Sequence, residues 1–201
     1  MDARAALLRS ISAALSLALL ALVAFGFASI PGKTGQEQAA TMDELASRTL
    51  ADLEKQEPRA KSEIDSCVGY VVMSNKLTKI PLVGVGAGYG VAVERATGAK
   101  TYVRMRRFDL GMGWGARAVR PVLIFQDEKS FKNFIDGDFS ASLGAEATAK
   151  AGGKGGGGSG GSGQSADEKK GYSSYVITDT GASATASLAL VRVKPVKLKK
   201  K

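Results

Sequence analysis

The sequence predicts an α+β fold, in which amphipathic helices near the N-terminus pack on a sheet formed by the rest of the chain. Apolar residues recur with helical spacing over residues 42–53. The stretch from residue 68 to residue 126 is rich in β-branched and aromatic residues, as strands are. Two runs in that stretch carry glycine at every second position, over residues 84–90 and 111–115. One short helix is expected after these strands, over residues 128–135.

The two glycine runs are the most distinctive feature of the sequence. Side chains of a strand alternate between its faces, so each run would leave one face bare. Glycine is unfavourable in a strand, and such a stripe therefore indicates either sharp coiling of the sheet or close approach of a second layer or a ligand chain. We favour the tight packing of a helix on a bent sheet, while the glycine faces could also line a cavity.

The glycines do not form a nucleotide-binding loop. The dinucleotide fingerprint G-x-G-x-x-G fails because Tyr89 and Val91 stand where its third glycine would be. Gly32-Lys33-Thr34 resembles the end of a P-loop, but Phe27 stands where the leading glycine is required. We reject both motifs.

Residues 1–28 predict export. Arg4 and Arg9 precede an uncharged run that extends to Ser29, and small residues suited to peptidase cleavage occur in Ala24-Phe25-Gly26 and Gly26-Phe27-Ala28. We favour a cleaved signal peptide. An uncleaved anchor is the alternative, because the run approaches the roughly 20 apolar residues of a membrane span. The expected location is periplasmic or membrane-associated.

The remaining chain divides into a linker over residues 29–40, one domain over residues 41–196 and a basic tail over residues 197–201. Thr41 and Glu44 form a capping box that predicts the start of the first helix. Pro58 predicts a second helix, with Ala60, Ile64 and Cys67 on its inner face. Within the domain, residues 152–170 are expected to be a flexible glycine-rich loop.

The strands are bounded by turn and loop residues. A loop is expected over residues 75–81 and turns at Ala96-Thr97-Gly98 and Asp179-Thr180-Gly181, the last of them closing a final hairpin. The expected strands are residues 68–74, the two glycine strands, and residues 100–108, 121–126, 139–149, 172–178 and 183–193. Asp127 is placed to cap the short helix.

Charge is divided unevenly along the chain, whose net charge is +9. Residues 36–68 hold eight acids and four bases, a net charge of −4, whereas residues 69–135 hold eleven bases and four acids, a net charge of +7. A basic sheet region favours anionic partners such as phospholipid head groups. The plain alternative is that these bases occupy ordinary solvated strand faces.

The composition argues against an enzyme. Histidine is absent and Cys67 is the single cysteine, so we expect no metal site, no disulfide within the chain and no cofactor. Two pairs of acids, Asp127 with Glu128 and Asp136 with Asp138, could in principle perform acid–base chemistry. Both pairs lie beside expected helix ends, where acids commonly act as caps.

The order of these parts resembles the SYLF domain family over roughly Leu45 to Val193. The similarity rests on the whole series rather than on one motif. It comprises Glu57-Pro58 after the leading helix, the strand Val68–Ser74, Asn75-Lys76-Leu77-Thr78-Lys79 before Gly84–Gly90, the second run Leu110–Ala116, the strand–helix unit Val122–Ile135 and a glycine-rich passage that ends in a hairpin.

The resemblance implies a compact α+β fold with a strongly twisted antiparallel sheet and no enzymatic activity. We accordingly predict a strongly twisted antiparallel β-sheet or partial barrel, with the N-terminal helices and one short helix packed on it. Eukaryotic members of the family bind phosphoinositides and some bind actin, and secreted bacterial members have no clear ligand.

The sequence thus predicts an exported, non-enzymatic module that associates with anionic phospholipid at a membrane surface through basic residues of the sheet. The candidate lipid-binding residues are Lys76, Lys79, Arg104, Arg106, Arg107, Arg117 and Arg120. Arginine is suited to this role because its guanidinium can form paired hydrogen bonds with phosphate. The alternative is a structural module that binds an envelope protein or an acidic polymer. Nucleic acid is not an expected partner because the protein is expected to be exported.

Overall fold

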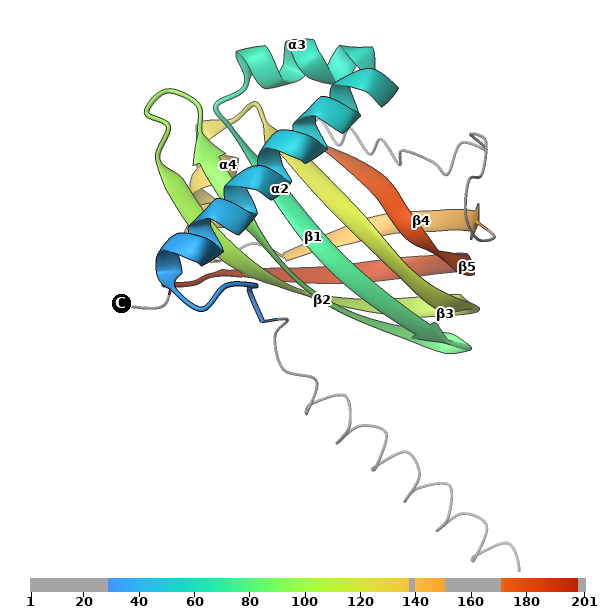
Figure 1. Ribbon diagram of the computed structural model, residues 1–201. Coiled ribbons are helices and arrows are strands. Elements are labelled where there is room, and N and C mark those ends of the chain that lie inside the picture. The colour runs from blue at the N-terminus through green and yellow to red at the C-terminus, as the bar shows by residue number, and fades with distance from the viewer. Residues whose placement is uncertain (1–28, 138–139, 151–170, 199–201) are drawn as a thin grey trace, which may run out of the picture.

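The computed structural model describes residues 29–137, 140–150 and 171–198, and for part of the strands it describes the backbone alone. The elements in chain order are α2 (Gly35–Gln56), α3 (Pro58–Ser66), β1 (Gly69–Ile80), β2 (Leu82–Glu94), β3 (Lys100–Phe125), α4 (Glu128–Ile135), β4 (Ser140–Lys150) and β5 (Tyr172–Pro195) (Figure 1). Among the helices so described, none has the length and apolar character required to cross a membrane.

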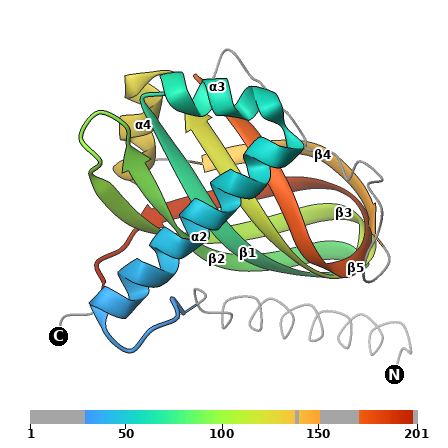
Figure 2. The ribbon, with the colours of Figure 1, turned by 45° about the horizontal axis from the view of Figure 1, so that its top comes forward.

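All strands pair antiparallel in one sheet, with the order β1-β2-β3-β5-β4 and an additional pairing between β1 and β3. The extra pairing arises because β3 bends. Its first half pairs with β2, its second half pairs with β1, and β5 follows nearly its whole length. The sheet therefore wraps around without closing, as Figures 1 and 2 show. The predicted α+β fold with a strongly twisted antiparallel sheet is confirmed.

The first helix starts earlier than predicted. It begins at Gly35, and Thr34 caps it by accepting a hydrogen bond from the backbone N–H of Glu37. Thr34 and Glu37 have the same spacing as Thr41 and Glu44, so the sequence offers two capping signals and the chain uses the first one. The linker predicted over residues 29–40 is therefore wrong in its second half, and Ile30 is already part of the core.

Two predicted interruptions of the sheet are absent. The loop expected over residues 75–81 is strand as far as Ile80, and the chain reverses only at Pro81. The final hairpin is likewise wrong, because β5 runs through Asp179-Thr180-Gly181 as one strand. Asp179 is instead the extra residue of a bulge, since Thr178 and Thr180 pair with adjacent residues of β3. The turn-forming residues bend the strand without reversing it.

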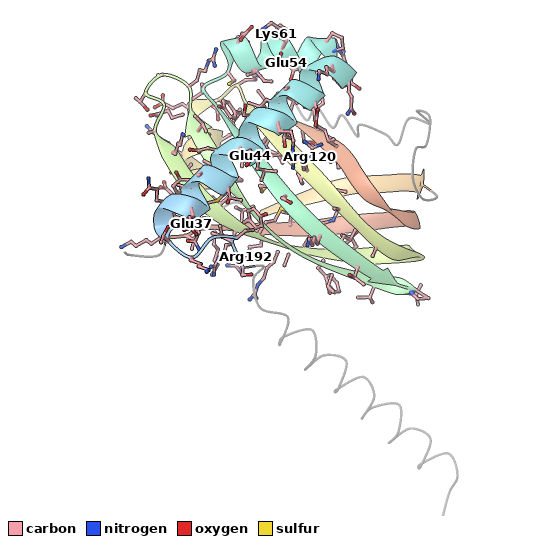
Figure 3. The ribbon with its side chains drawn as sticks, viewed as in Figure 1. Glu37, Glu44, Glu54, Lys61, Arg120 and Arg192 are labelled. Atoms are coloured by element: carbon pink, nitrogen blue, oxygen red, sulfur yellow. The ribbon has the colours of Figure 1, made fainter. Side chains whose placement is uncertain are left out.

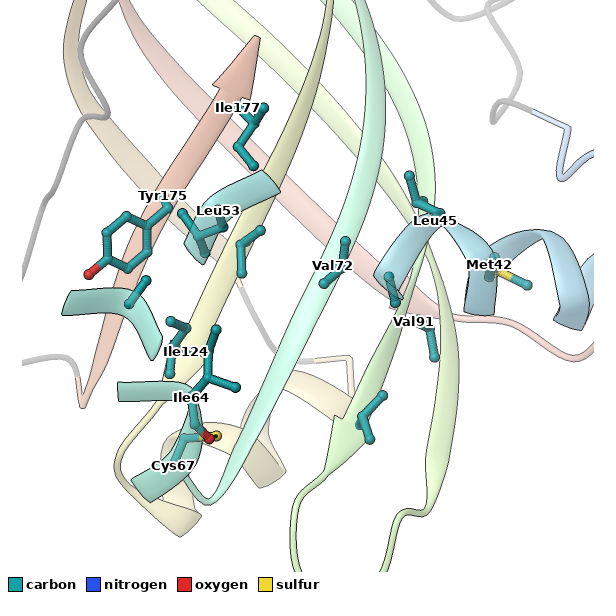
Figure 4. Close-up of a cluster of buried hydrophobic side chains, with 14 of the residues drawn as sticks. Met42, Leu45, Leu53, Ile64, Cys67, Val72, Val91, Ile124, Tyr175 and Ile177 are labelled. Atoms are coloured by element: carbon teal, nitrogen blue, oxygen red, sulfur yellow. Dashed lines mark hydrogen bonds between the residues drawn. The ribbon is translucent and has the colours of Figure 1, made fainter. Parts of the chain in front are cut away.

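The wrapped sheet has an outer face, which α2 and α3 cover, and an inner face, on which α4 packs. The outer cluster joins helix residues such as Met42, Leu45 and Leu53 to Val72 and Val91 of the sheet (Figure 4). The inner cluster is centred on aromatic residues. The rings of Phe131 and Phe134 in α4 lie 5.6 and 5.5 Å from that of Phe125. The predicted inner face of α3 is confirmed, since Ala60, Ile64 and Cys67 are buried, and the predicted short helix α4 buries Phe131 and Phe134.

The glycine stripe of β2 lies on the inner face, opposite the side on which α2 packs. A Cβ atom at Gly88 would lie 2.1 Å from the carbonyl oxygen of Ser74, and one at Gly90 would lie 2.2 Å from that of Val72. The stripe therefore allows β2 to lie close against β1 where the sheet coils. This corrects our preferred interpretation, in which a helix would have packed on the glycines.

Candidate functional site

The helices leave part of the outer face uncovered. On the outer face of β2, Val91 and Val93 are buried beneath α2, Tyr89 is half-buried against the same cluster, and Ala87 is the next position beyond it. On β2 and the strands beside it, outer-face positions between Tyr89 and the β1–β2 turn are therefore more exposed to solvent than those beneath α2. Any charged residues aligned with Ala87 are accessible to a partner.

A row of bases crosses the sheet at this level. Lys76 of β1 pairs with Ala87, Ala87 pairs with Arg106 of β3, and Arg106 pairs with Arg192 of β5. Lys76, Arg106 and Arg192 are all exposed. Residues directly opposite each other on neighbouring strands share one face, so the three bases project from the same side.

The adjacent row carries two further bases. Tyr89 pairs with Arg104, and Arg104 pairs with Lys194, which is exposed. We call Lys76, Arg104, Arg106, Arg192 and Lys194 the basic band. Three of its members were predicted from the sequence. Arg192 and Lys194 were not predicted as site residues, and their alternation with Val191 and Val193 was the available sign that they lie on one face of a strand.

Arg107 does not belong to this surface. It lies on the inner face, where its Nε donates to Oδ1 of Asp109 at 2.7 Å and its Nη2 donates to Oδ2 at 3.2 Å. Both side chains are fully buried in this ion pair. Arg107 cannot reach an external phosphate, and we remove it from the candidate lipid-binding residues. The reason is strand alternation, which places Arg106 outside and Arg107 inside.

Arg120 is also removed from that set. It lies on the outer face beneath α2, with 5% of its surface exposed. Its guanidinium donates to Oγ1 of Thr49 at 3.0 Å and to Oδ2 of Asp52 at 2.9 Å. These contacts join α2 to the second half of β3. Figure 3 shows Arg120 beside α2, whose acidic residues Glu37 and Glu44 lie along the helix.

Lys79 and Arg117 are placed by their backbones alone. Lys79 pairs with Gly84 and Gly115, and Arg117 pairs with Leu77, near the end of the sheet where β1 meets β2. Their side chains lie outside the described part of the structure. Both residues stay candidates that the described residues do not test.

Three of the acids proposed as alternatives for catalysis are described by the structure, and each has a local helix contact or capping position. Asp127 caps α4 by accepting a hydrogen bond from the backbone N–H of Ser130 at 2.7 Å, and hydrogen bonding from Ser130 lowers the pKa of this carboxyl. Glu128 pairs with Lys132 at 2.7 Å. Asp136 is the C-cap of the same helix, and Asp138 lies outside the described residues. Among the described residues, no group of three potential ligands could hold a metal ion.

A polar cluster between α3 and β5 was not anticipated from the sequence. The hydroxyls of Ser173 and Tyr175 donate to the two carboxylate oxygens of Glu63, at 2.5 and 2.8 Å. Burial and the hydrogen bond to Glu63 raise the pKa of Tyr175 well above its usual value. Both carboxylate oxygens are thus engaged, and the cluster fastens α3 to the outer face.

Salt bridges also link the acidic helix to the sheet. Lys100, at the start of β3, pairs with Asp43 of α2 at 2.9 Å, and its hydrogen bond to Asp43 raises the pKa of the ammonium group. The acids of α2 therefore meet the sheet at its covered part. Lys76, Arg106 and Arg192 lie one row beyond Tyr89 and are exposed, so their positive field is directed to solvent.

No family model matches the chain. The chain is similar to a protein named Beta cell expansion factor A from Aeromonas veronii, with 32% identity over 120 residues. The match covers 60% of this chain and 43% of that protein, so the chain spans less than half of its relative's length.

Proposed function

We propose that this chain is an exported, non-enzymatic module of the SYLF type that associates with anionic phospholipid through the basic band. The observation that carries the proposal is the row formed by Lys76, Arg106 and Arg192 across four paired strands, in which Ala87 of β2 lies between Lys76 and Arg106. These bases are exposed on one face, and Arg104 and Lys194 lie in the next row. Export is supported by the sequence of residues 1–28, with its basic start and apolar run.

The geometry suits a flat, anionic surface better than a small ligand. The band is spread across strands that lie about 4.8 Å apart. Each base near an anionic membrane adds about 1 kcal/mol of attraction. Five bases acting together would hold the protein at a membrane, while the acids of α2 would disfavour contact through the helical side.

The test is flotation with lipid vesicles. The chain from Ser29 onward contains every described helix and strand, and it would be mixed with neutral vesicles or with vesicles rich in phosphatidylglycerol. We expect flotation with the anionic vesicles, and a steep loss of binding as salt shortens the screening length from about 10 Å at 0.1 M.

The deciding variant is the double charge reversal Arg106→Glu with Arg192→Glu. It should weaken binding to anionic vesicles roughly a thousandfold, because two attractions of about 1 kcal/mol each become two repulsions of similar size. The matched control is Lys61→Glu with Lys129→Glu, which changes the net charge equally at exposed positions of α3 and α4. If both double variants bind equally well, the basic band is not the contact surface. If the unaltered protein floats under no condition, the proposed function is wrong and a protein or an acidic polymer becomes the candidate partner.

A further inference from the structure

An apolar end of the sheet lies next to the basic band. Leu82 and Leu110 are the large apolar side chains that the structure describes as exposed, at 58% and 48%. Their positions are adjacent near the turn from β1 to β2, since Leu110 pairs with Val83 and Leu82 pairs with Gly111. The register puts Leu110 on the outer face and Leu82 in line with the glycine stripe, so the two leucines bracket the end of the sheet. Figures 1 and 2 show this end of β1 and β2 extending beyond the layer of helices.

The strand register orders the outer face from apolar to basic. Starting at the turn, the cross-strand pairs between β2 and β3 are Val83 with Leu110, Val85 with Phe108, Ala87 with Arg106, and Tyr89 with Arg104. The side chains of Val83, Val85 and Phe108 are half-exposed. Two apolar pairs therefore precede the first base. These four outer-face residues, together with Leu82 of the adjoining turn, form what we call the apolar tip: Leu82, Val83, Val85, Phe108 and Leu110.

The spacing matches the depth of a membrane interface. Leu110 lies four positions along the strand from Arg106, which corresponds to about 13 Å at 3.3 Å per residue. A surface-bound protein buries its apolar face about 5–10 Å into the boundary between head groups and acyl chains. With Leu110 at that depth, Arg106 and its neighbours Lys76 and Arg192 would lie at the level of the phosphates.

The backbone of the turn gives independent support. Leu82 has a φ of 75°, and it is the non-glycine residue of positive φ among those described. Glycine or asparagine is the usual choice in that conformation, and a leucine there is strained. Pro81, which precedes it, has no amide hydrogen to leave unpaired in an apolar environment. The turn thus keeps an apolar side chain exposed despite backbone strain, and it lacks the one N–H that a residue other than proline would carry at position 81.

We propose that the apolar tip inserts into the interfacial region of an anionic bilayer, with the basic band at the level of the lipid phosphates. This proposal rests on the proposed function, and it adds a contact that salt does not screen. The bilayer is the occupant that fits, because the exposed apolar residues stand directly beside a row of bases.

The first test uses Leu82→Gly combined with Leu110→Thr. Glycine relieves the strained conformation at residue 82, and threonine keeps strand propensity at residue 110, so the variant is expected to fold. With phosphatidylglycerol vesicles at high salt, where the basic band is screened, binding should fall about tenfold relative to the unaltered protein. At low salt the loss should be smaller, because attraction by the band persists.

The second test locates the tip directly. An environment-sensitive fluorophore would be attached at Leu82→Cys, in a Cys67→Ala background, and compared with the same label at Ala96→Cys. Ala96 is exposed in the turn at the other end of β2, roughly 45 Å away along the strand at 3.3 Å per residue. On addition of anionic vesicles, the label at residue 82 should shift to the blue and the label at residue 96 should not.

The outcomes separate this inference from the proposed function. If charge reversal in the basic band abolishes binding while the tip variant binds normally and the label at residue 82 does not shift, the protein binds lipid but the tip does not insert. If the tip variant instead dissociates a self-associated form measured without lipid, and vesicle binding is unchanged, the tip is an interface between copies of the chain. Either result overturns the insertion proposal.

Discussion

Gly88 provides the sharpest test of how the glycine stripe shapes the sheet. A Cβ atom at this position would lie 2.1 Å from the carbonyl oxygen of Ser74 and 3.0 Å from the carbonyl carbon of the same residue. Both atoms belong to the backbone of β1, so no side-chain rotation can relieve the contact. Gly86 is the matched control. Its nearest obstacle is the side-chain oxygen of Asn75 at 2.7 Å, and the nearest backbone atom lies at 3.2 Å.

The geometry sets the expected energies. In Gly88→Ala the strands β1 and β2 must separate by about 1 Å to restore a normal contact, and this separation breaks hydrogen bonds between them. We therefore expect a destabilisation at the upper end of the roughly 1–3 kcal/mol cost of overpacking. Removing a glycine from a strand returns about 0.5–1 kcal/mol. The net loss in the free energy of unfolding should be about 2–3 kcal/mol. For Gly86→Ala a rotation of Asn75 suffices, and the net change should be within about 1 kcal/mol of zero.

The assay is urea unfolding of the two variants beside the unaltered protein. With a slope of about 2 kcal/mol per molar urea, Gly88→Ala should unfold at a midpoint about 1 M lower than Gly86→Ala. Failure of Gly88→Ala to fold while Gly86→Ala folds would agree with the same reasoning. If Gly88→Ala proved as stable as Gly86→Ala, close approach of β1 and β2 would not be the reason for the stripe.

Three further changes test individual contacts. Arg120→Ala should lower the free energy of unfolding, measured in urea, by roughly 2–3 kcal/mol. Breaking a fully buried ion pair costs about 3–5 kcal/mol, and the loss should be smaller here because a third of the Asp52 side chain remains in water. Tyr175→Phe should cost about 1 kcal/mol at neutral pH. The pKa of Tyr175 is raised in the folded state, so the stability contributed by its protonated hydroxyl is complete below pH 10 and is lost as the pH rises further. The phenylalanine variant should therefore lose less stability than the unaltered protein between neutral and strongly alkaline pH. Asn75→Leu should raise the free energy of unfolding by about 1–3 kcal/mol, since both polar atoms of this buried amide are unpaired among the described residues. A urea midpoint below that of the unaltered protein would contradict this expectation.

Features encoded by local spacing were predictable from the sequence. The inner faces of α3 and α4, the cap at Asp127 and the turn before Lys100 all follow from residues within a few positions of one another. The start of α2 was missed because Thr34 and Thr41 carry equivalent capping signals. Only tertiary contact chooses between them, and burial of Ile30 and Gln38 at the beginning of the helix favours the earlier one.

Features that depend on strand pairing could not be predicted. Nothing local shows that the residues around Asp179 form a bulge instead of a turn, because the difference lies in whether both flanking segments pair with β3. The basic band has the same origin. Arg106 and Arg192 are 86 positions apart in the chain, and they become neighbours only through the register of β3 and β5. The sequence indicated the sign of the charge but not which bases share a face.

The buried pair of Arg107 and Asp109 bears on how this surface is kept in place. A slip of one residue in the pairing of β3 would turn every side chain of the strand to the opposite face. Arg107 and Asp109 would then become exposed, while Arg106 and Leu110 would turn inward and leave an unpaired charge in the interior. A buried ion pair contributes little net stability, but the slipped alternative is penalised heavily, so the pair favours one register. The interior polar pair thus fixes which arginine of β3 lies on the outer face, although the glycine stripe of β2 has no side chains that could hold the register.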